Sequence, residues 1–203
     1  MRSIGLTGGI ASGKSTVSKT LADHGAALID ADLLGHRTYE PGSETFDQVV
    51  ERFGADLVAD DGQIDRKILG GKVFGQPDGM KQLTDIVWPG VRKLATAELQ
   101  RLAADGTEIA ILEAAVMIEA GWQDLVDEVW VVTVPPEIAR QRLMERNGLS
   151  AEDADKRINS QLTNDERSTH ADVIISTDCS FDEVTNRVNE VWSALQERIA
   201  SSA

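Results

Sequence analysis

The sequence predicts an α/β fold in which a five-stranded parallel sheet carries helices on both faces. Short apolar runs alternate with helical patterns along the chain, which is the first observation behind this prediction. The second is that the last four runs are almost continuously apolar, as is typical of strands buried on both faces. The third is a glycine-rich loop that joins the first run to the first helix. The predicted strands are residues 3–7, 26–30, 109–113, 128–134 and 171–177.

The glycine-rich loop reads GGIASGKST at residues 8–16 and fits the pattern G-x-x-x-x-G-K-[ST], with Gly8 and Gly13 at the fixed glycine positions. Glycines let the backbone turn its N–H groups around phosphate oxygens. Lys14 supplies a positive charge between the β- and γ-phosphates, and the Ser15 hydroxyl can ligate Mg²⁺. A β-prone run precedes the loop and a helical pattern follows it, so we expect ATP or GTP binding rather than a chance turn.

Composition excludes several classes of protein. The chain has 203 residues, enough for one α/β domain with an insertion, and its formal charge is −14. This negative field argues against non-specific binding to nucleic acid or to an anionic membrane, because it repels both. The single cysteine, Cys179, permits no internal disulfide. Since the sequence shows neither a signal peptide nor an apolar run of about 20 residues, we expect a cytoplasmic protein.

Two connections between predicted strands are longer than a simple crossover. The first carries several helical patterns, and we expect residues 32–106 to form a helical insertion that binds the acceptor. The second, residues 136–170, is polar, lacks aromatic residues and contains many arginines. We interpret it as a lid that excludes water from the phosphoryl group, with a solvated helical hairpin as the alternative. Residues 1–31, 107–135 and 171–203 would then form the nucleotide-binding core.

Candidate catalytic acids follow the ends of predicted strands, where open parallel sheets bind their ligands. Asp30 and Asp32 follow the second strand, and in an extended segment they would share one face. One of them could orient an acceptor hydroxyl and take its proton. Either could instead cap a helix, and the spacing does not decide between these roles. Glu113 ends the third strand, a place where phosphate-loop proteins hold Mg²⁺ through water.

Arginines of residues 136–170 are the remaining candidates. Arg142 and Arg146 are four residues apart and share one helical face, with Arg140 on a neighbouring face. An arginine on a closing lid could neutralise charge on the transferring phosphoryl group, and an exposed i,i+4 pair with Glu or Asp is the equal alternative. The histidines and Cys179 show neither zinc-ligand spacing nor a nucleophile pattern.

Further motifs, taken in order, resemble those of the dephospho-CoA kinase family. Over about residues 1–198 they are IGLTGGIASGKST, LIDADLLGHR, YEPG, IDRKILGGKVF, WPGVRK, LEAAVMIEAG and HADVIIST. Many folds share the phosphate loop alone, but its combination with DAD, EPG and DR…VF is far more specific. The stretch AAVMIEAGWQDLVDEVW is similar to the kinase half of the animal bifunctional CoA synthase.

The resemblance implies a P-loop NTPase-type three-layer sandwich with a helical CoA-binding insertion and a lid. It implies Mg²⁺-dependent transfer of the γ-phosphate of ATP to the 3′-hydroxyl of dephospho-CoA. It implies Asp32 as the general base on that hydroxyl, with Lys14 and Arg142 stabilising the transferring phosphoryl group. The implied ATP-binding residues are Gly8, Ala11, Ser12, Gly13, Lys14, Ser15, Thr16 and Arg146. Where the family's common bacterial pattern has other residues, this chain has His36, Trp88 and Ala115.

Two other functions remain compatible with parts of the sequence. A kinase for a nucleoside monophosphate or another small hydroxylated acceptor would share the loop and the lid, although the long insertion favours a larger acceptor. A GTPase switch would explain DLLG at residues 32–35, which fits D-x-x-G. That motif follows the loop by only one strand, however, and no N-K-x-D motif for guanine is present. Nothing in the sequence indicates the oligomeric state.

Overall fold

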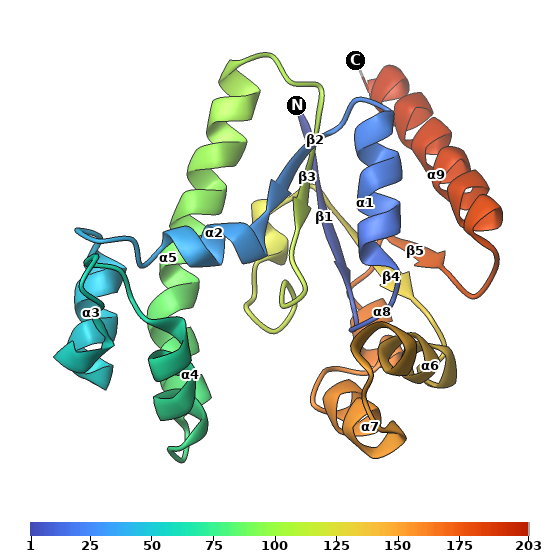
Figure 1. Ribbon diagram of the computed structural model, residues 1–203. Helices are drawn as coiled ribbons and strands as arrows, with labels where there is room; N and C mark the ends of the chain where they lie inside the picture. Colours follow the sequence, from blue (N-terminus) through green and yellow to red (C-terminus); the bar gives the residue numbers. More distant parts are fainter. Residues whose placement is uncertain (203) are drawn as a thin grey trace. The chain divides into compact units, whose positions relative to one another are not determined.

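The computed structural model describes residues 1–202 and confirms the predicted α/β fold with its five-stranded sheet (Figure 1). The strand order is β2-β3-β1-β4-β5. The strands are β1 (Arg2–Gly8), β2 (Ala27–Asp30), β3 (Ile109–Glu113), β4 (Glu128–Thr133) and β5 (Val173–Ser176). β1 pairs in parallel with both β3 and β4, and β4 pairs in parallel with β5. The central position of β1 therefore places the glycine-rich loop at the middle of one sheet edge.

The chain divides into two compact units, each with its own helices. The first contains residues 1–29 and the chain from Arg101 onward, and the second is Asp30–Gln100. Helices of the first unit are α1 (Lys14–Asp23), α6 (Pro136–Asn147), α7 (Ala151–Asn159), α8 (Asn164–Ser168) and α9 (Phe181–Ser202). The second unit holds α2 (Ala31–Arg37), α3 (Glu44–Phe53), α4 (Arg66–Phe74) and most of α5 (Gly79–Ala104). Two short 3₁₀ turns cover Ala55–Leu57 and Gln123–Leu125.

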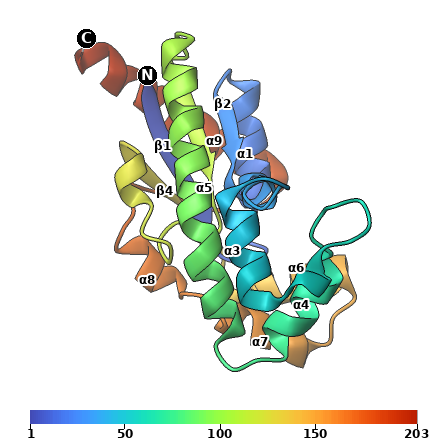
Figure 2. The same cartoon turned by 90° about the vertical axis from the view of Figure 1, so that its left-hand side faces the viewer.

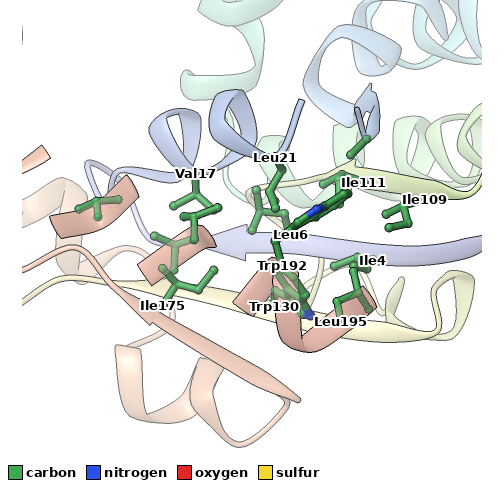
Figure 3. Packing of buried hydrophobic residues seen from close by; sticks show 14 residues of the cluster. Ile4, Leu6, Val17, Leu21, Ile109, Ile111, Trp130, Ile175, Trp192 and Leu195 are labelled. Carbon is green, nitrogen blue, oxygen red and sulfur yellow. The ribbon is translucent and has the colours of Figure 1, made fainter. Parts of the chain in front are cut away.

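The core of the first unit lies between the sheet and the pair α1 and α9 (Figure 3). Val17 and Leu21 stand one helical turn apart on α1 and meet Leu6 of β1, while Trp192 of α9 packs near Trp130 of β4. All of these side chains are at most 6% exposed. On the opposite face of β1, a Cβ atom at Gly5 would collide with Met117. Burial of this apolar surface stabilises the sheet and fixes the direction in which its loops leave it.

The two edge strands differ from the sequence expectation. Their apolar runs predict burial on both faces, which is correct for β3 and β4 but wrong for β2 and β5. Leu28 of β2 is 42% exposed and Ile174 of β5 is 53% exposed. A strand at the edge of a sheet has one neighbour instead of two, so an apolar run alone does not reveal how much of it remains accessible.

The second unit has a small core of its own, in which α3, α4 and α5 meet. Val49 and Phe53 of α3 pack with Leu69 and Val73 of α4, and α5, which Figure 2 shows along its length, adds Leu83 and other partly buried side chains. Capping side chains define where the two shorter helices begin. Ser43 accepts from Phe46 N (3.0 Å) and Asp65 accepts from Lys67 N (2.8 Å). Within residues 1–202, no helix has the length and apolar content needed to cross a bilayer.

Candidate active site

The glycine-rich loop connects β1 to α1 in a form that leaves the start of the helix open to a ligand. Gly13 is the N-cap of α1 in the left-handed conformation (φ 88°) and brings no capping side chain. The first turn of α1 contains no acid. Uncapped N–H groups together with the positive end of the helix dipole form an anion-binding site. Gly8 is required sterically, since a Cβ atom there would lie 2.6 Å from the Val132 carbonyl oxygen.

Lys14 and Glu113, predicted from separate motifs, form an ion pair. The Lys14 ammonium donates to the Glu113 carboxylate, and both side chains are largely buried, at 14% and 15% exposure. The pairing of β1 with β3 sets Leu6 opposite Glu113, so the end of β3 lies next to the loop. The ion pair holds the Lys14 ammonium beside the glycine-rich loop, where a phosphate oxygen can replace the Glu113 carboxylate as its partner.

Arg142 contacts the phosphate loop from α6. Its guanidinium donates to Ala11 O (3.3 Å), to Thr177 Oγ1 (3.0 Å) and to Thr177 O (2.7 Å). Thr177, directly after β5, is 2% exposed and donates from Oγ1 to Ser12 O (2.6 Å). Sequence reasoning missed Thr177, because a single threonine after a strand carries no distinguishing signal.

Arg140 and Arg146 bond elsewhere. Arg140 pairs with Asp155 of α7 (3.3 Å), with both side chains almost half exposed, so it forms an exposed ion pair between two helices rather than within one. Arg146 is exposed and donates from Nε to Asn147 Oδ1 (3.0 Å). Helical spacing groups Arg142 with Arg146, but the structure brings Arg142 to the loop and ties Arg146 to its sequence neighbour.

The two acids after β2 have separate positions. Asp30 is the N-cap of α2, and its Oδ1 accepts from Asp32 N (2.8 Å) and Leu33 N (3.1 Å). The helix-capping alternative is therefore correct for Asp30. The expectation that both acids share a face of an extended segment is wrong, because α2 begins at Ala31. Asp32 is exposed in the first turn of α2, where the helix dipole favours a carboxylate.

Two of the residues that depart from the family's common pattern also lie in the second unit. His36, near the end of α2, contacts the Arg66 guanidinium and, through Nδ1, the Tyr39 hydroxyl (3.4 Å). Trp88 precedes Pro89 within α5 and is partly buried. His36 is thus linked to α4, which begins at Arg66.

Two further side chains of residues 136–170 make contacts that were not predicted. Arg167 of α8 is fully buried and pairs with Glu119 (2.9 Å), and it also donates to Ala115 O (3.4 Å). Gln161, between α7 and α8, accepts from Ile10 N of the phosphate loop (2.8 Å). No motif distinguishes these two side chains from their polar neighbours.

The donors near the loop fit a metal ion that arrives with a nucleotide. Among residues 1–202, no group of three or more His, Cys, Asp or Glu side chains could hold a metal by itself. Ser15 on α1 offers an exposed hydroxyl, and Glu113 offers carboxylate oxygens beside the loop. Mg²⁺ is usually bound by one or two protein oxygens together with substrate phosphates and water. The donor set is therefore sufficient for Mg²⁺ bound together with phosphates.

Comparison with known proteins gives a consistent result. A sequence model described as dephospho-CoA kinase matches residues 2–183. The dephospho-CoA kinase of Symbiobacterium thermophilum is 43% identical over 96% of this chain and 81% of its own length. That of Geobacter sulfurreducens is 42% identical over 95% of this chain and 98% of its own length.

Solved structures agree with these sequence matches. Dephospho-CoA kinase from Campylobacter jejuni superimposes with a TM-score of 0.75 at 28% identity, covering 97% of this chain and 98% of that one. Shikimate kinase from Acinetobacter baumannii in complex with shikimate gives a TM-score of 0.54 at 17% identity, covering 98% and 94%. At that identity the second likeness concerns the fold alone.

Proposed function

Because the chain belongs to the dephospho-CoA kinase family, we propose how its residues divide the work of that family's reaction. The protein is a kinase that transfers the γ-phosphate of ATP to the 3′-hydroxyl of dephospho-CoA, the final step of CoA biosynthesis. The observation that carries the division of roles is the convergence of Lys14, Glu113 and Arg142 on one uncapped helix start.

ATP binds with its phosphates in the loop. Backbone N–H groups of residues 11–16 surround the phosphates, and Gly8 lets the loop pack closely on β4. Lys14 leaves Glu113 and moves onto the γ-phosphate, while Arg142 stabilises charge on the transferring group. Arg146, one helical turn further along α6, is a second guanidinium available to the nucleotide.

Mg²⁺, when bound, neutralises charge on the phosphates. Ser15 would hold it through the hydroxyl, and Glu113 would hold it through water. Ser15 follows Lys14 in the sequence, and Glu113 is the ion-pair partner of Lys14. When Lys14 moves onto the γ-phosphate, the Glu113 carboxylate is released and can contact the hydrated ion.

Asp32 is the general base. Asp30 forms the N-cap of α2 through two hydrogen bonds, so we assign to Asp32 the role of accepting the proton of the 3′-hydroxyl. In a parallel sheet the carboxyl ends of the strands share one edge, and α2 follows β2 directly as the phosphate loop follows β1. Asp32 lies in the first turn of α2, in an exposed position.

The larger parts of the chain have the following roles. Residues 32–106 bind dephospho-CoA, residues 136–170 act as the lid, and residues 1–31, 107–135 and 171–203 hold ATP. The separate core of the second compact unit supports the first assignment. The charge of −14 supports a small-molecule acceptor rather than a nucleic acid, and the single cysteine suits a cytoplasmic enzyme.

Mass spectrometry of the reaction tests the proposal directly. The protein is incubated with Mg-ATP and dephospho-CoA, beside parallel reactions with nucleoside monophosphates and shikimate. We expect dephospho-CoA alone to become one phosphoryl group heavier. Lys14→Ala should lower this transfer by at least about 10³-fold, whereas Lys19→Ala, an exposed lysine of the same helix, should not. Transfer to another acceptor only, or full activity of Lys14→Ala, would contradict the proposal.

A further inference from the structure

The backbone of the phosphate loop is held by three side chains from three different segments. Arg142 donates to the Ala11 carbonyl (3.3 Å) and Thr177 donates to the Ser12 carbonyl (2.6 Å). Gln161 accepts from the Ile10 N–H (2.8 Å). Two of these contacts therefore fix carbonyl groups, and the third fixes an N–H group at the beginning of the loop.

The residue between these contacts is strained. Ala11 has φ 59°, in the left-handed region that residues with a Cβ atom rarely adopt. Such a conformation persists when neighbouring groups hold it in place. Ile10 lies directly before Ala11, so the Gln161 contact fixes the peptide through which the chain enters the strained turn.

Gln161 lies where the 158–165 segment and the phosphate loop line the same pocket. This pocket of about 420 Å³ has Gly9, Ile10 and Ser12 of the loop in its lining. Gln161 lines this pocket and its side chain bonds to the loop, while Asn164 of the same segment donates from Nδ2 to Val134 O (2.7 Å). Because the Ile10 N–H is a donor, the atom of Gln161 that meets it is the amide oxygen.

We propose that Gln161 is a positioning residue that orders the phosphate loop before the nucleotide binds. Its amide oxygen holds the Ile10 N–H, which keeps the Ala11 turn in the conformation that directs the following N–H groups at phosphate. The inference rests on the proposed function and adds a residue from the 136–170 segment to that site. It also gives this segment a role in ATP binding through one defined bond.

Two variants of similar chemistry test the assignment. Gln161→Met keeps the side-chain length and removes the acceptor. Asn164→Leu removes a different amide of the same segment, one that bonds to Val134 O and not to Ile10. In calorimetry, Gln161→Met should weaken Mg-ATP binding about 10-fold, as expected for the loss of one partly buried hydrogen bond. In steady-state kinetics the same variant should raise KM for ATP and lower kcat. Asn164→Leu should stay within about twofold in Mg-ATP affinity.

Hydrogen exchange at the Ile10 amide reports the bond itself. By NMR, its protection should fall about 10-fold in Gln161→Met, as expected for a lost hydrogen bond, and should be unchanged in Asn164→Leu. Unchanged protection and affinity in Gln161→Met would overturn the inference. Equal losses in both variants would also overturn it, since general docking of the segment would then be responsible. Failure of the proposed function is distinguishable, because it would show as a wild-type protein that does not phosphorylate dephospho-CoA while the amide measurements still stand.

Discussion

Helices α1 and α2 each follow a strand of the sheet, α1 through the glycine-rich loop and α2 directly, and their N-termini are built in opposite ways. At α1 the N-cap is Gly13, which has no side chain to offer, and the first turn begins with Lys14. At α2 the N-cap is Asp30, whose carboxylate accepts two N–H groups, and the first turn contains Asp32. The first helix start keeps its donors for a ligand anion, whereas the second uses its donors within the protein. This difference teaches that a side-chain cap removes a helix start from the candidates for binding phosphate, which supports the proposed role of the α1 start.

The largest expected effect comes from the acid next to the cap. Asp32→Asn should lower kcat for dephospho-CoA phosphorylation by about 10²–10⁴-fold, the usual loss for a well-placed base. ATP binding should remain nearly normal, because the phosphate loop at α1 is untouched. Steady-state kinetics together with calorimetric titration of Mg-ATP measures both quantities.

Asp30→Asn is the matched control for that variant. Asparagine caps helices as well as aspartate does, so α2 should start at the same residue and kcat should stay within a few-fold of the wild-type value. If Asp30→Asn lost as much activity as Asp32→Asn, the assignment of one acid to structure and the other to chemistry would be wrong.

The sequence predicts elements whose signal is local. The strands Ile109–Glu113 and Glu128–Thr133 are recognisable as apolar runs, and helix α5 as a long periodic stretch that tolerates Pro89. The phosphate loop is recognisable because its glycines and Lys14 stand at fixed spacing within one short segment. Lys14 and Glu113 are singled out separately, by the loop motif and by the end of a strand, but their ion pair is not predicted by either signal.

Contacts between distant segments could not be predicted in the same way. Gln161 bonds to Ile10 across 151 positions of the sequence, and Thr177 bonds to Ser12 across 165. Polar side chains of this kind are common, and their spacing within the chain carries no periodic signal. The role of Asp30 was ambiguous for a related reason, since capping depends on where the helix begins, and helix starts are poorly defined by sequence.

Arg142 offers the next test, because its guanidinium reaches from α6 to the Ala11 carbonyl of the loop that precedes α1. Arg142→Ala should reduce kcat by about 10²-fold, the usual loss when one hydrogen-bond donor to the transition state is removed. ATP binding should weaken by a smaller factor. Arg140→Ala removes an exposed pair with Asp155 on the same helix and should change neither quantity measurably. A fall in ATP affinity alone would instead identify Arg142 as a contact to the adenine or ribose.

A smaller effect is expected from the N-cap of α1 itself. Gly13→Ala places a Cβ atom 3.1 Å from Thr177 Cγ2 at a left-handed residue (φ 88°), so we expect about 10-fold weaker Mg-ATP binding. Gly25→Ala is the matched control, because Gly25 is also left-handed (φ 100°) but has no atom within 4 Å of the added Cβ. That variant should lose about 1 kcal/mol of stability and keep its ATP affinity. Equal losses of Mg-ATP affinity in Gly13→Ala and Gly25→Ala would show that backbone strain at either end of α1 is sufficient to weaken binding.

The smallest effect concerns the capped helix start. Asp30→Ala removes the acceptor of two N–H groups and should lower the free energy of unfolding by about 1 kcal/mol, whereas Asp30→Asn should leave it unchanged. Ser43→Ala at the start of α3 removes an equivalent cap and should cost a similar amount. Urea unfolding measures all three variants. If Asp30→Asn lowered the free energy of unfolding as much as Asp30→Ala, the negative charge of Asp30, rather than its capping hydrogen bonds, would stabilise α2. The two helix starts would then differ in charge rather than in capping.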